Sequence, residues 1–550
     1  MNILIVVGFL LIESREEMKN NKKTILMTTM LLALILLGIG TIAYFRRTVN
    51  GDITGNAGNL VLIVNEANAV ENESFEVILQ RSEEEPFIMP DDKGIFNLNI
   101  VSTGSTTDVA ISIAISRVNL PNNLKFYSDE KHTNEITNYG TVIKKSADMT
   151  KTIPVYWFWD GSVSDEDDSE FINKEISANI SVSATIAKTL YDTLMSYDKT
   201  IDANINFGQG ASVNNGQGLM MLNGTQNDEY PVLYYRGNIN NNNILFAGYC
   251  WLIVRTTETG GTKIIYNGEV NEDGSCINYS GVGGKIADTN YTNVYVENSL
   301  IKFNIGNNSP VHVGYMYNDD VFFSLSLANG RTDYKEFLED NTIDLETGRH
   351  VQNLYDSNAK TIIDAWYKAK FEGTTEENLL EDTVWCNDRS LISNTHSLEN
   401  YIDTYSWLLF GSGTRLVEPM LDTSFYISPS LTCNRKMDEF TVSSENGNGD
   451  LTYPIGMLTA DEIVLAGNVY VEGVDLVITY LTLPNHYFWT LSPYGYIYRA
   501  NGANMIIVAA GAHANNSVVN DAGIRPSISL NNGTYILSGN GSFENPYVVG

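Results

Sequence analysis

VAISIAIS, residues 109–116, places a large apolar residue at every second position and a small or polar one between. The same alternation occurs in FNLNI at 96–100 and in ISVSATI at 180–186. Successive side chains of a strand point to opposite faces, so this period gives each strand one apolar face. Several such strands joined by polar turns predict an antiparallel β-sandwich over residues 48–188.

Upstream of these strands, the segment TILMTTMLLALILLGIGTIAYF at 24–45 contains no charged residue. At about 1.5 Å per residue, a helix of this length crosses a hydrocarbon core of about 30 Å. Lysines at 19, 22 and 23 precede it, which is typical of the positive region of a signal or anchor segment. We therefore expect residues 1–23 in the cytoplasm and the body of the chain outside. Met18 is a candidate true start, because this basic region begins there.

The chain is acidic, with 66 Asp and Glu against 34 Lys and Arg and a net charge of −32. Such a surface repels the phosphate backbone, so we exclude nucleic acid as a partner of the main body. A length of 550 residues predicts more than one domain.

Four cysteines, Cys250, Cys276, Cys386 and Cys433, contain no CxxC spacing, which excludes zinc-ribbon and thioredoxin-type sites. If the cysteines pair in sequence order, Cys250 with Cys276 and Cys386 with Cys433, the two disulfides would suit an exported chain. Four buried thiols are the alternative, since free cysteine is usually buried. The sequence leaves both open.

Beyond residue 188 the composition changes. Residues 189–230 are rich in Asn, Gly and Ser and predict a linker with a short helix near 190–197. Residues 231–550 predict an irregular α+β domain, which begins with a hairpin of 246–255 and 262–267. Two helices are expected, one over 358–371 from its apolar stripe and one over 459–467 from the capping box Thr459-Ala460-Asp461-Glu462.

Four stretches carry a resemblance: GIGTIAYF at 38–45, GNLVL at 58–62, NLPNNLKFY at 119–127 and YWFWD at 156–160. With the lysine-led apolar segment, they make residues 18–188 similar to the TasA/camelysin family. The resemblance implies a jelly-roll-like sandwich, export through a SipW-like signal peptidase with cleavage between Ala43 and Tyr44, and a role in surface fibres or biofilm matrix. Arg46 and Arg47 stand where that family has acidic or neutral residues, so a permanent anchor at 24–45 is the alternative. The chain has no HExxH motif, so no protease activity is carried over.

The C-terminal part carries a second resemblance, in WCNDRS at 385–390, YPIGMLTADE at 453–462, and the pair WTLSP at 489–493 and GIRP at 523–526. These segments resemble a domain of unassigned function found in bacterial surface proteins. The last pair is also similar to C-type-lectin-like domains of the sulfatase-modifying class. The catalytic cysteines of those enzymes lie late in the domain, whereas no cysteine follows Cys433.

The sequence assigns no catalytic, cofactor or metal site. The acidic loop 165–170 is interpreted as a solvated charge run, with calcium binding as the alternative. Asp388 and Arg389 are interpreted as a polar network that braces a loop or as part of a ligand site, and an internal ion pair is favoured over a catalytic one. Trp489 and Arg525 are candidates for bracing the fold or for contacting a sugar ligand. The histidines share no metal-binding spacing: His132, His312, His350, His396, His486 and His513.

We therefore expect a non-catalytic protein on the outer face of a bacterial membrane, or secreted to the cell surface, that acts in adhesion, matrix assembly or ligand capture. Its expected partners are the membrane through 24–45, a SipW-like peptidase, and surface glycans or other matrix proteins. Two alternatives remain: a glycan- or peptide-binding sensor module, and an enzyme of the hydrolase or modifying class with a dispersed site.

Overall fold

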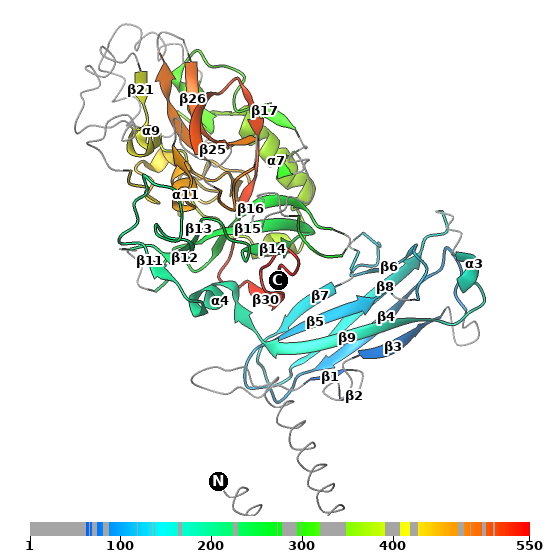
Figure 1. The fold of residues 1–550 in the computed structure, drawn as a ribbon. Coiled ribbons are helices and arrows are strands. Elements are labelled where there is room, and N and C mark those ends of the chain that lie inside the picture. Colours follow the sequence, from blue (N-terminus) through cyan, green and yellow to red (C-terminus); the bar gives the residue numbers. More distant parts are fainter. Residues whose placement is uncertain are drawn as a thin grey trace, which may run out of the picture. The chain divides into compact units, whose positions relative to one another are not determined.

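The computed structural model describes residues 62–550 except 65–66, 69–73, 81–86, 118, 134, 137, 163–167, 224–228, 272, 278–293, 297–298, 319–347, 391–406, 418–426, 471–477, 484–485, 498–501 and 510–511. The chain is mainly β and divides into two compact units at Ala187 and Lys188 (Figure 1). Among the described residues, no helix has the length and apolar character needed to cross a bilayer. The segment 24–45, with the proposed cleavage site at Ala43 and Tyr44, lies outside those residues.

The first unit consists of two antiparallel sheets. One has the order β2 (Ala67–Asn68), β1 (Ile63–Val64), β4 (Lys93–Val101), β8 (Thr150–Trp159) and β6 (Leu124–Tyr127). The other has the order β3 (Ser74–Leu79), β9 (Ile176–Ile186), β5 (Val109–Ser116) and β7 (Asn138–Ile143). A short helix, α3 (Asp168–Phe171), precedes β9.

The core of this unit is built by the predicted period of two. Val109, Ile111, Ile113 and Ile115 of β5 are buried and pack in one cluster with the buried residues of β4, β8 and β9. Apolar faces from both sheets therefore meet in one core, as in a sandwich. Gly94 of β4 lies opposite Trp157 of β8, and a Cβ at Gly94 would come within 2.6 Å of the indole.

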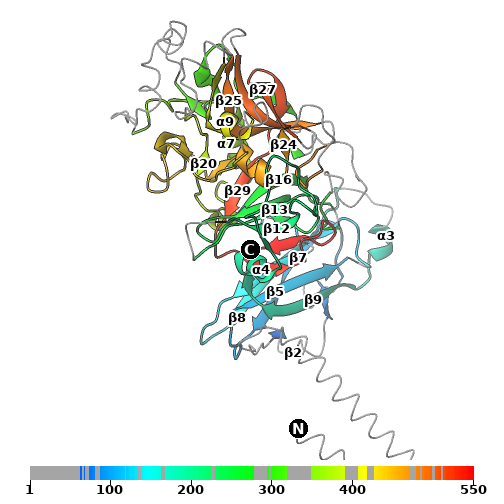
Figure 2. The ribbon, with the colours of Figure 1, turned by 60° about the vertical axis from the view of Figure 1, so that its left-hand side comes forward.

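The second unit contains a large mixed sheet, whose C-terminal strands lie among the strands of residues 233–269 in both ribbon views (Figures 1 and 2). Its strands are β10 (Lys188–Thr189), β11 (Thr200–Ile201), β12 (Gly218–Met221), β13 (Leu233–Arg236), β14 (Asn243–Phe246), β15 (Tyr249–Thr256), β16 (Thr262–Glu269), β23 (Ile455–Gly456), β29 (Ser527–Leu530), β30 (Tyr535–Ser538) and β31 (Tyr547–Val549).

A second sheet of this unit is centred on the long pair β25 (Tyr487–Ile497) and β26 (Gly502–Ala509). Its other strands are β17 (Leu300–Lys302), β21 (Trp407–Leu409), β24 (Val469–Tyr470), β27 (Ala512–Ser517) and β28 (Asp521–Gly523). Two small pairs complete the described strands: β18 (Met316–Tyr317) with β19 (Tyr355–Asp356), and β20 (Trp385–Cys386) with β22 (Glu439–Phe440).

The helices follow the sequence signals. The predicted helices are confirmed as α4 (Leu190–Ser196), α7 (Asn358–Lys370) and α11 (Ala460–Leu465), and α9 (Gly411–Leu416) was not anticipated. The capping box at Thr459 is confirmed, because both of its reciprocal hydrogen bonds are present. In Figure 1, α11 lies between the two sheets, and it contacts β13 of one and β25 and β26 of the other.

Two predictions about this unit need correction. The linker expected at 189–230 is wrong for the described residues, because β10 pairs with β30 and β12 pairs with β13, which makes the segment part of the large sheet. The hairpin of β15 and β16 is confirmed, but Phe246 ends a separate strand. Ala247 and Gly248 turn the chain there with positive φ, which a strand cannot accommodate.

Candidate functional site

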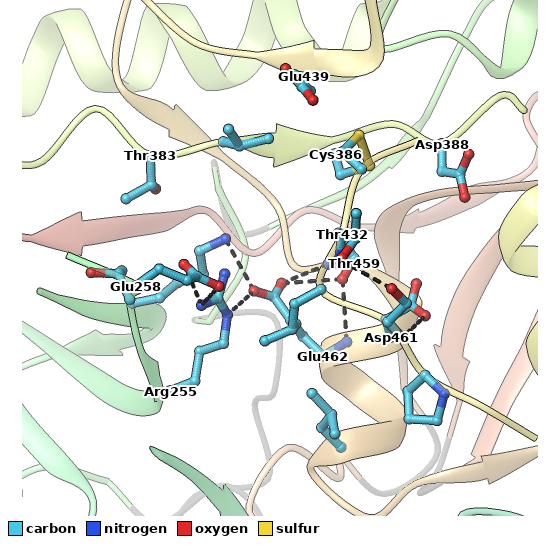
Figure 3. Close-up of a pocket in the computed structure, with 18 of the residues that line it drawn as sticks. Arg255, Glu258, Thr383, Cys386, Asp388, Thr432, Glu439, Thr459, Asp461 and Glu462 are labelled. Atoms are coloured by element: carbon cyan, nitrogen blue, oxygen red, sulfur yellow. Dashed lines mark hydrogen bonds and ion pairs between the residues drawn. A yellow bond between two sulfur atoms is a disulfide. The ribbon is translucent and has the colours of Figure 1, made fainter. Parts of the chain in front are cut away.

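A pocket of about 800 Å³ opens in the second unit, and four segments supply most of its lining. They are the turn of the β15–β16 hairpin, the segment 381–388, the loop 429–433 and the first turn of α11. Figure 3 shows Glu439, Cys386 and Asp388 along one side of this pocket and Arg255, Glu462 and Asp461 along the other. Segments from distant parts of the chain therefore form one concave site.

Two cations face each other across the hairpin at the base of the pocket. Arg255 of β15 and Lys263 of β16 are register partners, and their side chains are 7% and 2% exposed. The Lys263 ammonium lies 4.1 Å from the ring centroid of Trp385, which stabilises it through a cation–π contact. Burial lowers the pKa of Lys263, and the neighbouring Arg255 adds to that effect. Such a pair of like charges requires an anion close by.

Glu462, the third residue of α11, supplies that anion. Its Oε1 accepts from Arg255 Nε at 2.7 Å and from Lys263 Nζ at 3.0 Å, and its Oε2 accepts from the Thr459 backbone N–H at 3.0 Å. Burial alone would raise the pKa of Glu462, but the two cations and these hydrogen bonds outweigh it and lower the pKa to about 2. The capping-box glutamate is therefore also the counter-ion of a buried triad.

A second ionic cluster stands beside the first. Arg415 of α9 donates from Nη1 to Asp388 at 2.5 Å and from Nη2 to Asp461 at 2.6 Å. Asp461 also accepts from the backbone N–H of Ser430 at 2.8 Å, so it holds the loop 429–433 against α11. Arg415 therefore joins three walls of the pocket.

Asp388 and Arg389 each form an internal ion pair, as expected, but not with each other. Arg389 pairs with Asp438 at 2.7 Å, whereas Asp388 pairs with Arg415. The two side chains leave opposite sides of the backbone, because neighbouring residues of an extended segment point in opposite directions. Asp388 thus lines the pocket and Arg389 braces the interior.

Two further carboxylates lie at the hairpin turn. Glu258 contacts Arg255 Nη1 at 3.4 Å, with half of its side chain exposed. Glu381 accepts from the hydroxyls of Thr257, at 3.0 Å, and Thr259. Burial raises the pKa of Glu381, the two hydroxyls oppose that rise, and the nearby Glu258 adds to it. The wall thus makes the charged form of Glu381 less favourable than it is in water.

Both disulfides of the sequential pairing are present, Cys250–Cys276 and Cys386–Cys433. Cys250 and Cys276 are 0% and 2% exposed. Cys386 and Cys433 are half-buried and line the pocket, where their bond joins β20 to the loop 429–433. One disulfide is therefore interior, and the other is part of the pocket wall.

The remaining candidates lie elsewhere. Trp489 and Arg525 are each 1% exposed and hydrogen-bond to backbone carbonyls, of Ile301 at 2.8 Å and of Tyr266 at 3.0 Å. Neither lines the pocket. Among the described residues no group of His, Cys, Asp or Glu has the arrangement of a metal site. His396 and residues 165–167 of the acidic loop lie outside those residues.

Sequence reasoning missed the charged residues that define the pocket: Arg255, Lys263, Glu381, Arg415 and Glu462. One local signal was available, since Arg255 and Lys263 stand opposite each other in a hairpin whose central residues are apolar. Their partner is 207 positions from Arg255, and no periodicity reaches that far.

No family model matches this chain, and the searches of curated proteins and of solved structures give no significant match.

Proposed function

We propose that this protein is a non-catalytic bacterial surface protein whose second unit captures a small polar ligand or a peptide side chain in the pocket. The pocket itself carries the proposal. Its volume, about 800 Å³, lies in the range of small-ligand sites, and its wall is held by two ionic clusters and a disulfide. Because the side chains of such a wall are already ordered, ligand binding loses less conformational entropy than it would at a flexible site.

The wall chemistry favours a peptide or amine-type ligand over a glycan. Sugar sites usually present an aromatic face on which a ring stacks. The described residues that line this pocket contain hydroxyl, carboxylate, amide, cationic and aliphatic groups and no aromatic ring. Of the two binding alternatives, the side-chain or small-molecule ligand thus has the better support.

An extracytoplasmic location is part of the proposal. Two disulfides within one chain support it, because such bonds persist in oxidising compartments. The apolar segment 24–45 would hold the chain in the membrane, or would be removed after Ala43 by a SipW-like peptidase. N-terminal sequencing of the mature protein distinguishes these cases: a start at Tyr44 indicates release, and a start at Met18 or Met1 indicates a tether.

For the first unit we propose a TasA/camelysin-like jelly roll with a role in adhesion or matrix assembly. The two antiparallel sheets and their shared core support this assignment.

For the second unit, a C-type-lectin-like relationship is part of the same proposal. Electron microscopy of the full-length protein tests assembly, since fibres or oligomers are expected and monodisperse monomers at high concentration contradict it.

The capture function is tested by filling the pocket. Thr432 lines it from an exposed position, so Thr432→Trp should block entry without disturbing the core. The matched control is Ala369→Trp, at an exposed position of α7 outside the pocket. In calorimetry with a panel of peptides, amines and glycans, we expect the full-length protein to bind some members of the panel. Thr432→Trp should abolish that binding, whereas Ala369→Trp should leave it unchanged. Equal binding by both variants would contradict capture at this site.

A further inference from the structure

The charge of the pocket wall is strongly one-sided. Seven carboxylates and three cations line it. The cations are deep in the wall, with Lys263, Arg255 and Arg415 exposed by 2%, 7% and 17% of their side chains, and each is ion-paired. The exposed side of the wall is acidic, because Glu258 and Glu439 keep 51% and 26% of their side chains accessible. A ligand that enters therefore meets carboxylates before it meets cations.

Glu381 and Asp382 are the carboxylates of the pocket wall that have no salt bridge among the described residues, and Asp382 is instead held by the backbone N–H groups of Val442 and Ser443. Among the described residues, no lysine or arginine nitrogen lies within 4.0 Å of Glu381. Its hydrogen bonds come from two neutral hydroxyls, those of Thr257 and Thr259. The hairpin is also shaped around it, since a Cβ on Gly261 would collide with Glu381 Oε2. The carboxylate is thus held in place in the wall by neutral groups.

The electrostatic surroundings agree with this geometry. Burial and the charge of Glu258 raise the pKa of Glu381, and the hydroxyl bonds and the more distant Arg255 only partly offset them. A cation brought beside Glu381 would remove part of that unfavourable energy. The same cation would be attracted by Glu258 and Glu439, which line the same pocket.

We propose that the pocket binds a primary alkylammonium group, with Glu381 as its principal anionic contact. This inference rests on the capture function proposed above and names its ligand class. A primary ammonium donates three hydrogen bonds, and the carboxylate and hydroxyl oxygens of Glu381, Glu258 and Thr383 supply acceptors. A quaternary ammonium would instead need an aromatic cage, which the described lining does not contain.

A lysine side chain of a peptide and a free diamine both present this group, and calorimetry on the full-length protein separates them. The probes are Nα-acetyl-lysine methylamide, 1,5-diaminopentane, the Nε-acetylated form of the lysine probe and Nα-acetyl-glutamate methylamide. We expect both amines to bind at least tenfold more tightly than the acetylated and anionic probes. Tighter binding of the lysine probe identifies a peptide source, and tighter binding of the diamine identifies a free amine.

Glu381→Gln tests the assigned contact, because glutamine keeps the shape, accepts from one threonine hydroxyl with its oxygen and donates to the other with its amide nitrogen. We expect amine binding to weaken at least tenfold, with Glu544→Gln, at an exposed position outside the pocket, unchanged. If Glu381→Gln alters the unfolding curve, Glu439→Gln replaces it, with a smaller loss expected because Glu439 lies 3.8 Å from Lys436.

The outcomes separate this inference from the capture function. Amine affinity that Glu381→Gln leaves intact overturns the inference, and so does a preference for the acetylated or anionic probe. Either result leaves capture standing if Thr432→Trp still blocks the ligand that binds. Absence of binding across the whole panel overturns both proposals.

Discussion

Arg255 Nε and Glu462 Oε1 are 2.7 Å apart although 207 residues separate them in the chain. This contact joins the hairpin of the large sheet to α11, which itself contacts the second sheet. With Lys263, the two residues form a triad in which every charge is almost completely buried. These ion pairs hold α11 against the β15–β16 hairpin, and both elements line the pocket.

Removal of the anion of this triad should destabilise the second unit strongly. Glu462→Gln leaves Lys263 without its counter-ion and Arg255 with only the half-exposed Glu258 at 3.4 Å. Loss of one partner of a buried pair costs about 3–5 kcal/mol. We expect the free energy of unfolding to fall by that order in guanidinium titrations followed by tryptophan fluorescence. Glu445→Gln, at an exposed position, is the matched control and should change little. A loss below about 1 kcal/mol would contradict the role given to the triad.

Much of the fold could be predicted because its signals are local. The alternation at 109–116 became β5, and the capping box at Thr459 became the start of α11. The pocket could not be predicted in the same way. Its charged residues come from segments that have no common pattern, and only the fold brings Glu462 beside Lys263. The linker expected at 189–230 was wrong for a similar reason, since Asn- and Gly-rich composition does not reveal that β12 pairs with β13.

Stability should fall in mild acid through His513. Burial lowers the pKa of this side chain to about 4, and the carbonyl of Leu416 only partly opposes that effect. The pKa of His513 in the folded protein lies below the ordinary value of 6.5, which applies to the unfolded chain. The neutral side chain therefore makes its full contribution to the free energy of unfolding above pH 6.5, and this contribution declines as the pH falls toward 4. A difference of this size corresponds to about 3 kcal/mol.

His513→Gln removes the titrating group and provides the comparison. We expect thermal unfolding from pH 7 to pH 4 to show a steeper loss of stability in the native protein than in the variant. Parallel pH profiles for the two proteins would refute a buried neutral His513. Glutamine can still donate to a carbonyl, so the variant keeps one hydrogen-bonding group at that position.

The two disulfides should differ in their reactivity toward reductant. Cys386–Cys433 lines an open pocket, whereas Cys250–Cys276 is buried, so thiol attack should reach the former first. Loops of 47 and 26 residues correspond to about 4 and about 3.5 kcal/mol in the chain-entropy model. Their stabilising effects are thus similar, and access decides the order.

Timed alkylation with mass spectrometry measures that order. In native buffer with a water-soluble phosphine, we expect Cys386 and Cys433 to be labelled well before the other pair. Ligand binding should weaken along with that labelling, because the bond holds the loop 429–433 in the wall. In denaturant both pairs should react at similar rates, which is the internal control. Earlier labelling of Cys250 and Cys276 in native buffer would show that the pocket does not expose its disulfide.

Trp489 should contribute to stability and not to binding. The ring is 1% exposed, packs edge-on against Phe303, and donates from Nε1 to the carbonyl of Ile301 at 2.8 Å. Trp489→Phe leaves a small cavity and a carbonyl without its donor, so we expect a loss of about 2 kcal/mol in free energy of unfolding. Trp366→Phe, a change at a partly exposed ring, should cost less. Because Trp489 lies outside the pocket, the affinity of the variant for amines in calorimetry should stay within twofold of the native value. A larger change would indicate that Trp489 contributes to ligand binding.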